Sequence, residues 1–297
     1  IVDAMQRGQI PAAIGLRALA LLGDRTALPA VLELLESPSA AVRRSAIDAA
    51  SELLDPAEPE GTAVDPIAMQ LVAPRLTPAE SVALCGLLGR TGSPRAAAVL
   101  MSLAAAKDRT VRLSAIRALG DVGAAGQETL LLGRLTGGDP EGRLQASMSL
   151  GRVAGDAGAR GLLSRLSVAS EQDRAALGIA FSGAMSRARS EDLPAKAVAL
   201  LDTLGVPGRE VLIEALGRMP TASAARELDR LTGRLASPDD RRKLAEAAAG
   251  HATMLPTIRR MTNDLDPSVQ ANAVWSLGVT GEAADIGSLE KLVQHRD

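Results

Sequence analysis

The chain has 297 residues, a formal net charge of −2 and only 1% aromatic residues, so its core must be built from aliphatic side chains. The near-neutral balance provides no clustered positive charge to neutralise phosphates, and no nucleic-acid partner is expected. The single cysteine, Cys85, excludes an internal disulfide and a four-cysteine metal site. No apolar run reaches the roughly 18 residues that span a bilayer, so no membrane insertion is expected.

One motif recurs along the whole chain. Its clearest copy is VRLSAIRALG, residues 111–120, and the same frame lies around the anchor residues Gly23, Ser51, Gly89, Gly120, Gly151, Ser182, Gly217, Gly250 and Gly278. Successive anchors are 28 to 38 residues apart. A period of roughly 20 to 50 residues is typical of solenoids, whose units bury their apolar faces only against neighbours. The sequence therefore predicts one continuous array over residues 1–297.

Each unit of the array is expected to contain two helices, and no strand is expected. The first helix is a short apolar stretch, and in chain order these stretches are 27–35, 96–105, 128–135, 159–166, 193–204, 222–235, 254–261 and 286–293. The second helix carries the motif, with Val111, Ala115, Ile116 and Leu119 on one apolar stripe.

The ends of the motif helices are marked by characteristic residues. The helices are expected to start at side chains that can accept the free N–H groups of a first turn, namely Ser39, Asp108, Asp139, Ser170 and Asp266. They are expected to end at glycines such as Gly120 and Gly123, because glycine adopts a left-handed backbone conformation with little steric strain.

One segment departs from the repeat pattern, and the end of the chain continues it. Residues 55–65, DPAEPEGTAVD, form the one clear irregularity and predict an exposed acidic, Pro-containing loop. This loop is interpreted as a tolerated insertion, with a functional lid as the alternative. At the other end, Asp297 follows Gly278 by 19 residues, the interval that separates Gly120 from the motif-opening Asp139. We therefore expect residues 1–297 to be a fragment of a longer chain.

The segments at 39–55, 108–123 and 266–281 resemble HEAT repeats of the short bacterial type named after phycobilisome lyases. An aspartate, a Val-Arg pair, a small residue and Leu-Gly recur in phase in this family. The resemblance implies an all-α fold, a right-handed α-solenoid of about eight to nine two-helix repeats, with motif helices along the concave side. A repeat of this kind serves many unrelated proteins, so it is specific for fold and weak for function.

The resemblance also implies a structural ladder in which an arginine pairs with the turn aspartate of an adjacent repeat. The matching arginines are Arg43, Arg112, Arg143, Arg174, Arg209 and Arg242, and the matching aspartates are Asp108, Asp139 and Asp266. Gly15, Ser81 and Gln270 occupy the arginine phase in three copies, and Gly205 stands where the aspartate of Arg209 would be. A guanidinium fork can bond a carboxylate and carbonyls together. The alternative for the arginine series is a phosphate-binding stripe.

No catalytic, cofactor-binding or metal-binding residue is identified, and the chain is predicted not to be an enzyme. Its two histidines, His251 and His295, make no metal pair. No P-loop, dinucleotide glycine fingerprint, HExxH motif or nucleophile elbow is present. A phycobilin-lyase-like accessory or a regulatory subunit of an enzyme is the alternative, and a nucleic-acid-binding HEAT-like protein is a third. Two aromatics are few for a tetrapyrrole pocket or for stacking on bases.

The residues that remain for function are on the surface of the motif helices. The positions that point away from the apolar stripe give a candidate partner-binding set of Val82, Leu113, Arg117, Leu144, Met148, Ile179 and Trp275. An apolar centre with a polar rim is typical of protein interfaces. Burial of these side chains between neighbouring helices is the alternative. We predict a bacterial protein-interaction scaffold, for which a cytoplasmic location is favoured.

Overall fold

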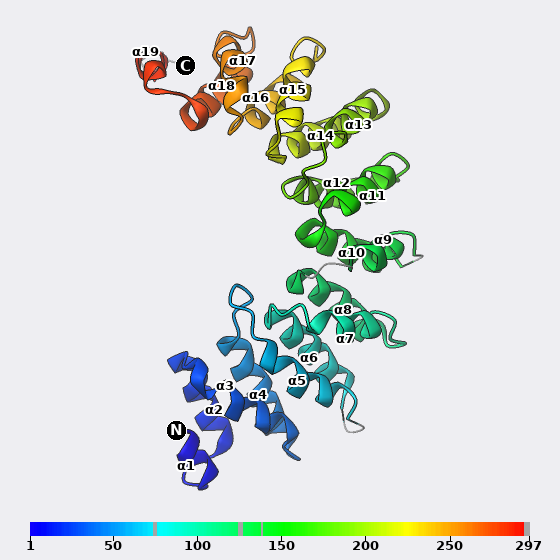
Figure 1. The fold of residues 1–297 in the computed structure, drawn as a ribbon, viewed down its shortest axis with the longest axis vertical. Helices are drawn as coiled ribbons and strands as arrows, with labels where there is room; N and C mark the ends of the chain where they lie inside the picture. Colours follow the sequence, from blue (N-terminus) through cyan, green and yellow to red (C-terminus); the bar gives the residue numbers. More distant parts are fainter. Residues whose placement is uncertain (74–75, 124–126, 138, 294–297) are drawn as a thin grey trace. The chain divides into compact units, whose positions relative to one another are not determined.

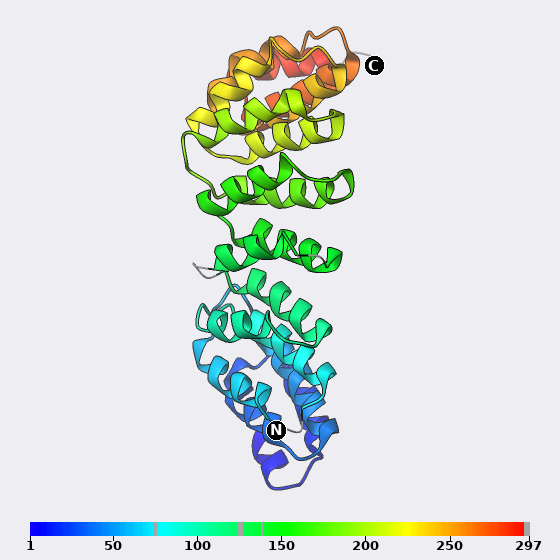
Figure 2. The ribbon, with the colours of Figure 1, turned by 90° about the vertical axis from the view of Figure 1, so that its right-hand side faces the viewer.

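The computed structural model describes residues 1–73, 76–123, 127–137 and 139–293, and within these ranges it contains helices and no strand. The chain divides into two compact units, unit 1 at Ile1–Val153 and unit 2 at Ala154–Asp297. In each unit the helices stack in chain order (Figures 1 and 2). The all-helical prediction is confirmed. The number of repeats and the single array over 1–297 stay predictions.

Unit 1 alternates short first helices with longer motif helices. The first helices are α1 (Val2–Gln6), α3 (Leu28–Glu33), α5 (Val64–Leu71), α7 (Ala96–Leu103) and α9 (Gln127–Arg134), and the motif helices are α2 (Ala12–Leu22), α4 (Ala40–Leu53), α6 (Pro78–Arg90), α8 (Arg109–Val122) and α10 (Pro140–Val153). Successive motif helices pack on one another, α2 on α4, α4 on α6, α6 on α8 and α8 on α10.

Unit 2 repeats the same scheme. Its first helices are α11 (Asp156–Leu166), α13 (Leu193–Leu200), α15 (Ala222–Leu231), α17 (Leu255–Met261) and α19 (Ile286–Val293), and its motif helices are α12 (Glu171–Met185), α14 (Val206–Arg218), α16 (Pro238–Ala247) and α18 (Pro267–Thr280). The motif helices again form a layer, with α12 on α14, α14 on α16 and α16 on α18.

The predicted loop at 55–65 is shorter than expected. Residues 61–63 form a 3-10 turn and α5 begins at Val64, because Val64 and Ile67 are both buried and Pro66 is tolerated in a first turn. The part outside regular helical structure is therefore residues 55–60, which we call the strap. The strap is held in place: the Glu60 N–H donates to the Thr91 carbonyl at 2.7 Å.

The predicted helix starts are confirmed. Ser39 accepts from the Val42 N–H, Asp108 from Val111 and Ser170 from Asp173, at 3.5, 3.0 and 3.2 Å. Asp139 and Asp266 accept from the N–H groups two residues on, at 3.2 and 2.9 Å. The cap of α6 was not predicted from the sequence. It is a capping box, in which the Thr77 and Glu80 side chains each accept from the backbone N–H of the other residue.

Glycine plays two different roles, only one of which was predicted. Gly123 ends α8 in the left-handed region, at φ 66°, as expected. Gly120, however, lies inside α8 and is buried, and a Cβ there would stand 2.8 Å from the Cα of Ser149 on α10. Gly217 on α14 is similar, since its Cβ would stand 2.7 Å from the Cα of Ala247 on α16. These glycines let neighbouring motif helices approach closely.

Gly217→Ala tests this role. In an ordinary helix interior the change to alanine stabilises by up to about 1 kcal/mol, but here overpacking against backbone should lower the free energy of unfolding by about 1 to 3 kcal/mol. Gly278→Ala is the matched control, because Gly278 has the same motif phase on α18 and no atom within 4 Å of its Cβ position. Urea unfolding followed by circular dichroism measures both. Equal shifts in the two variants would contradict the packing role.

Candidate functional site

The ladder arginines form hydrogen bonds with the turn that precedes their own helices. Five of the six, all but Arg242, donate to a backbone carbonyl five or six residues earlier, with bonds from Arg43 to Ser37 at 3.0 Å, Arg112 to Ala106 at 2.8 Å, Arg143 to Gly137 at 3.0 Å, Arg174 to Ala169 at 3.1 Å and Arg209 to Leu204 at 3.5 Å. These carbonyls lie in the turns that follow the first helices, where no regular helical hydrogen bond satisfies them. The guanidinium groups supply the donors, and this use does not favour the phosphate-binding stripe.

The three ladder aspartates have partners other than those implied by the resemblance. Asp108 and Asp266 accept bonds within their own helix starts, from Thr110 and Ser268 among others. Asp139 is paired with the Arg109 guanidinium at 3.2 Å, one helical turn before the expected Arg112. Hydrogen bonds from Arg109 are the largest cause that lowers the pKa of Asp139.

Arg43 and Arg209 each reach a carboxylate in the next repeat, and neither carboxylate was predicted. Arg43 on α4 bonds Glu80 on α6, with Nε–Oε1 and Nη2–Oε1 distances of 2.9 and 2.7 Å, and both side chains are buried. Arg209 on α14 bonds Asp240 on α16 at 2.9 Å. The Asp240 carboxylate is 4% exposed. The absence of an aspartate at Gly205 therefore does not leave Arg209 without a partner.

The eighth motif copy is shifted by one residue, so Arg241 and not Arg242 holds the ladder position. Arg241 donates to the Ala236 carbonyl at 2.6 Å. It also forms a bidentate pair with the Asp264 carboxylate, with two hydrogen bonds of 3.0 and 3.1 Å. Arg242 only approaches Glu210, at 3.7 Å. The shift was not visible because Gly250 resembles an anchor, whereas it is a turn residue at φ 84° beyond the end of α16.

A second series of bonds links successive motif helices, and the sequence reading missed it. Hydroxyl and amide side chains donate to carbonyls of the preceding motif helix, in the pairs Ser114 to Val82 at 3.0 Å, Ser149 to Ile116 at 2.8 Å, Asn272 to Arg242 at 3.2 Å and Ser276 to Ala245 at 2.6 Å. Ile116 and Ala245 each lie four residues after their ladder arginine, Arg112 and Arg241, which supports the corrected register.

The candidate partner-binding residues are largely exposed, so burial between helices is excluded for most of them. In unit 1 Leu144 and Met148 on α10 are 43% and 46% exposed, Arg117 is exposed, and Val82 and Leu113 are half-buried. In unit 2 Ile179 on α12 is 72% exposed and Trp275 on α18 is 56% exposed. We call the positions on each unit the motif-helix face of that unit.

Trp275 stands at a shallow cavity of about 210 Å³ formed by α14, α16 and α18. Lys243 lies between two carboxylates there, 3.4 Å from Glu214 and 3.2 Å from Glu246. Arg218 is 3.0 Å from Glu214. The indole is thus the exposed apolar element beside a set of charges that already neutralise one another, which is the apolar-centre, polar-rim pattern of interfaces.

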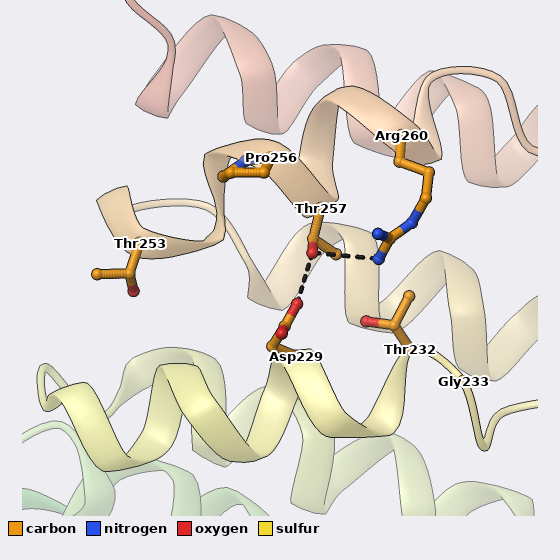
Figure 3. Close-up of a pocket in the computed structure, with 7 residues that line it drawn as sticks. All are labelled: Asp229, Thr232, Gly233, Thr253, Pro256, Thr257 and Arg260. Carbon is orange, nitrogen blue, oxygen red and sulfur yellow. Dashed lines mark hydrogen bonds between the residues drawn. The ribbon is translucent and has the colours of Figure 1, made fainter.

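A polar pocket of about 460 Å³ lies between the first helices α15 and α17 (Figure 3). The Thr257 hydroxyl donates to Asp229 at 2.5 Å and accepts from Arg260 at 3.2 Å. Thr257 is buried, while Asp229 and Arg260 are exposed. Because the three groups satisfy one another, they form a bridge between consecutive repeats.

The remaining reactive side chains are placed away from these surfaces. Cys85 is wholly buried, and burial raises the pKa of its thiol to about 12, so the interpretation as a core residue is confirmed. His251 is buried against the Gly217 carbonyl at 3.0 Å, and burial is the main cause that lowers its pKa. His295 and Asp297 lie outside the described residues.

The described part of the chain holds no group of three or more His, Cys, Asp or Glu side chains placed to bind a metal ion. None of its helices combines the length and the apolar character needed to cross a membrane.

The Arg43–Glu80 pair should be the most costly ladder element to break in unit 1. Arg43→Ala leaves a buried carboxylate without its cation, which should cost about 3 to 5 kcal/mol. Arg112→Ala removes bonds to carbonyls only and should cost about 1 to 3 kcal/mol. Urea unfolding of the two variants measures the difference, and equal losses would argue against a carboxylate partner for Arg43.

The corrected register predicts that Arg241→Ala lowers the free energy of unfolding by about 1 to 3 kcal/mol. Arg242→Ala should lower it by at most about 0.5 kcal/mol. Hydrogen bonds from Arg241 are the largest cause that lowers the pKa of Asp264. A carboxyl whose pKa falls on folding stabilises the fold above its unfolded pKa, and this contribution is lost as the pH falls through its lower folded pKa. The deficit of Arg241→Ala should therefore be full above about pH 4 and shrink below it. Unfolding between pH 3 and 7 measures this, and a pH-independent deficit would contradict the pairing.

Comparisons with known proteins support the repeat assignment. Residues 69–151 match the family model described as HEAT repeats. A homology model of the full-length AP-3 complex in an intermediate open conformation aligns with a TM-score of 0.51 and 16% identity, covering 97% of this chain and 57% of that chain. At this identity the likeness shows the fold alone.

Two further solved structures align less well. A crystal structure of an engineered protein has a TM-score of 0.49 and 16% identity, covering 96% of this chain and 91% of that chain. Human deoxyhypusine hydroxylase in complex with glycerol has a TM-score of 0.37 and 18% identity, covering 86% and 96%. No curated protein sequence matches the chain significantly. The stacked helix pairs show an all-helical, solenoid-like fold, and residues 69–151 of it match HEAT repeats.

Proposed function

We propose that this chain is a non-enzymatic scaffold that binds a protein partner along its motif-helix face. The observation that carries the proposal is the exposure of large apolar side chains at outward positions of motif helices, Leu144 and Met148 in unit 1 and Ile179 and Trp275 in unit 2. Full burial of such a side chain contributes about 1.5 to 3 kcal/mol, and partial exposure forgoes a fraction of that free energy. A partner surface would recover that free energy.

The arrangement in unit 1 gives the proposed surface a defined shape. Leu144 and Met148 lie four residues apart on α10, and Leu113 and Arg117 lie four residues apart on α8, so each pair shares one helix face. Since α8 packs on α10, the two pairs are on neighbouring helices of one layer. An apolar patch with a guanidinium at its border suits a partner helix or strand with an apolar stripe.

Two finer assignments belong to the same proposal. We assign the repeats to the short bacterial type, on the basis of the motif shared by 108–123 and 266–281, and we favour a cytoplasmic location. Trp275 serves the same function in unit 2, because Trp is the residue type most enriched at binding hot spots.

The proposal predicts that Leu144→Asp/Met148→Asp and Trp275→Ala each reduce capture of the partner from cell lysate by about tenfold or more, which corresponds to about 1.4 kcal/mol. Quantitative mass spectrometry of the captured proteins, referenced to the parent chain, measures the loss. Because these side chains are exposed, unfolding free energies should stay within about 0.5 kcal/mol of the parent.

Val72→Asp and Val168→Asp are the matched controls. Both side chains are exposed, at 83% and 75%, and both follow first helices instead of lying on the motif-helix face. They should leave capture unchanged. Undiminished capture by the motif-helix variants, or equal loss in the controls, would overturn binding through this face.

A further inference from the structure

Unit 1 carries a second candidate surface, a groove between the first helices α3 and α5. It has a volume of about 560 Å³ and is lined by Arg25, Thr26, Leu28, Pro29, Leu32, Glu33, Glu36, Glu60, Thr62, Pro66 and Met69. Leu28 and Leu32 are buried at its floor, whereas Met69 is 62% exposed. We call this the first-helix groove. Its size lies within the range of roughly 300 to 1,000 Å³ that is typical of ligand sites.

The groove is negatively charged. Three glutamates, Glu33, Glu36 and Glu60, line it against a single cation, Arg25. That cation is already engaged, since Arg25 forms an ion pair with Glu58 of the strap and also donates to the Glu58 carbonyl at 3.3 Å. Hydrogen bonds from Thr62 are the main cause that lowers the pKa of Glu60, so this carboxylate is ionised throughout the neutral range.

The strap borders the groove through Glu60, which lines it. It is part of the longest interval between anchors, the 38 residues from Ser51 to Gly89. Its contacts fix it at both ends of the site, through Glu58 to Arg25 and through the Glu60 N–H to the Thr91 carbonyl. The Arg95 guanidinium adds a bond to the Gly61 carbonyl at 3.0 Å. A preorganised site loses less conformational entropy when a ligand binds.

We propose that the first-helix groove binds a basic amphipathic segment of a protein partner. The apolar side chains of the segment would cover Met69 and the leucine floor, and its Lys or Arg side chains would meet Glu33 and Glu60. Phosphate-bearing ligands are disfavoured because the net charge of the lining repels them. This site is separate from the motif-helix face, because it lies on the first helices.

A synthetic probe tests the proposal directly. The probe is a fluorescein-labelled, 16-residue helical peptide with leucines on one face and lysines on the other, titrated with the full chain and followed by fluorescence anisotropy. Glu33→Gln/Glu60→Gln should weaken binding by at least about fivefold and reduce its dependence on salt. Met69→Ser should weaken binding by at least about threefold, because it removes apolar contact area.

The controls separate this groove from general electrostatic attraction and from the motif-helix face. A peptide with glutamates in place of the lysines should not bind. Glu171→Gln/Glu290→Gln neutralises two exposed carboxylates of unit 2 and should leave binding unchanged. Trp275, the single indole of the chain, should show no change in fluorescence when the basic peptide binds.

The proposal fails if the basic peptide does not bind, if the groove variants bind it as the parent does, or if Glu171→Gln/Glu290→Gln lowers the affinity equally. Leu144→Asp/Met148→Asp should retain full peptide binding. The two proposals can therefore fail independently. Undiminished partner capture by the motif-helix variants would not affect the peptide result, and absence of peptide binding would not affect the capture result.

Discussion

The close approach of successive motif helices is the constraint on which the rest of this structure depends. At Gly120 and Gly217 a single added carbon atom would collide with the neighbouring helix. At this spacing side chains reach backbone groups across the interface, as Ser149 does at the Ile116 carbonyl. A core built mainly of small and aliphatic residues fits this geometry, and Phe181 is the buried aromatic exception in a chain with very few aromatic residues.

The polar groups at the ends of the helices are satisfied by a shared device. A guanidinium reaches back to the carbonyls in front of its own helix, and in Arg43 and Arg209 the same group also contacts a carboxylate of the next repeat. A planar fork with several donors can serve both partners at once, which a lysine ammonium does less well. The arginines are thereby used for the fold, and they are not available as a continuous basic surface.

The two candidate binding surfaces differ in their physical basis. The motif-helix face presents apolar side chains beside charges that already compensate one another, as around Lys243, so it would contribute affinity mainly through burial of apolar area. The first-helix groove has three glutamates against one engaged cation, so it would discriminate by charge. A scaffold with both surfaces can bind two partners of different chemistry in one unit.

The sequence by itself determined the features that depend on local interactions. The helical period, the alternation of first and motif helices and the caps at Ser39, Asp108 and Ser170 follow from residues within a few positions of one another. The outward positions of the motif helices could also be predicted, because helix geometry sets which residues share a face. Exposure of Leu144, Met148, Ile179 and Trp275 agrees with that prediction.

Only the tertiary structure decided the features that depend on residues about 30 positions apart. Gly120 resembles a helix end in sequence, and its packing role appears only when Ser149 is placed against it. Asp240 as the partner of Arg209, and Arg241 in place of Arg242, required the adjacent helices, because a shift of one residue hardly alters the sequence pattern but rotates a helical side chain by about 100°. The first-helix groove likewise exists only because the strap and two first helices, separate in sequence, come together in space.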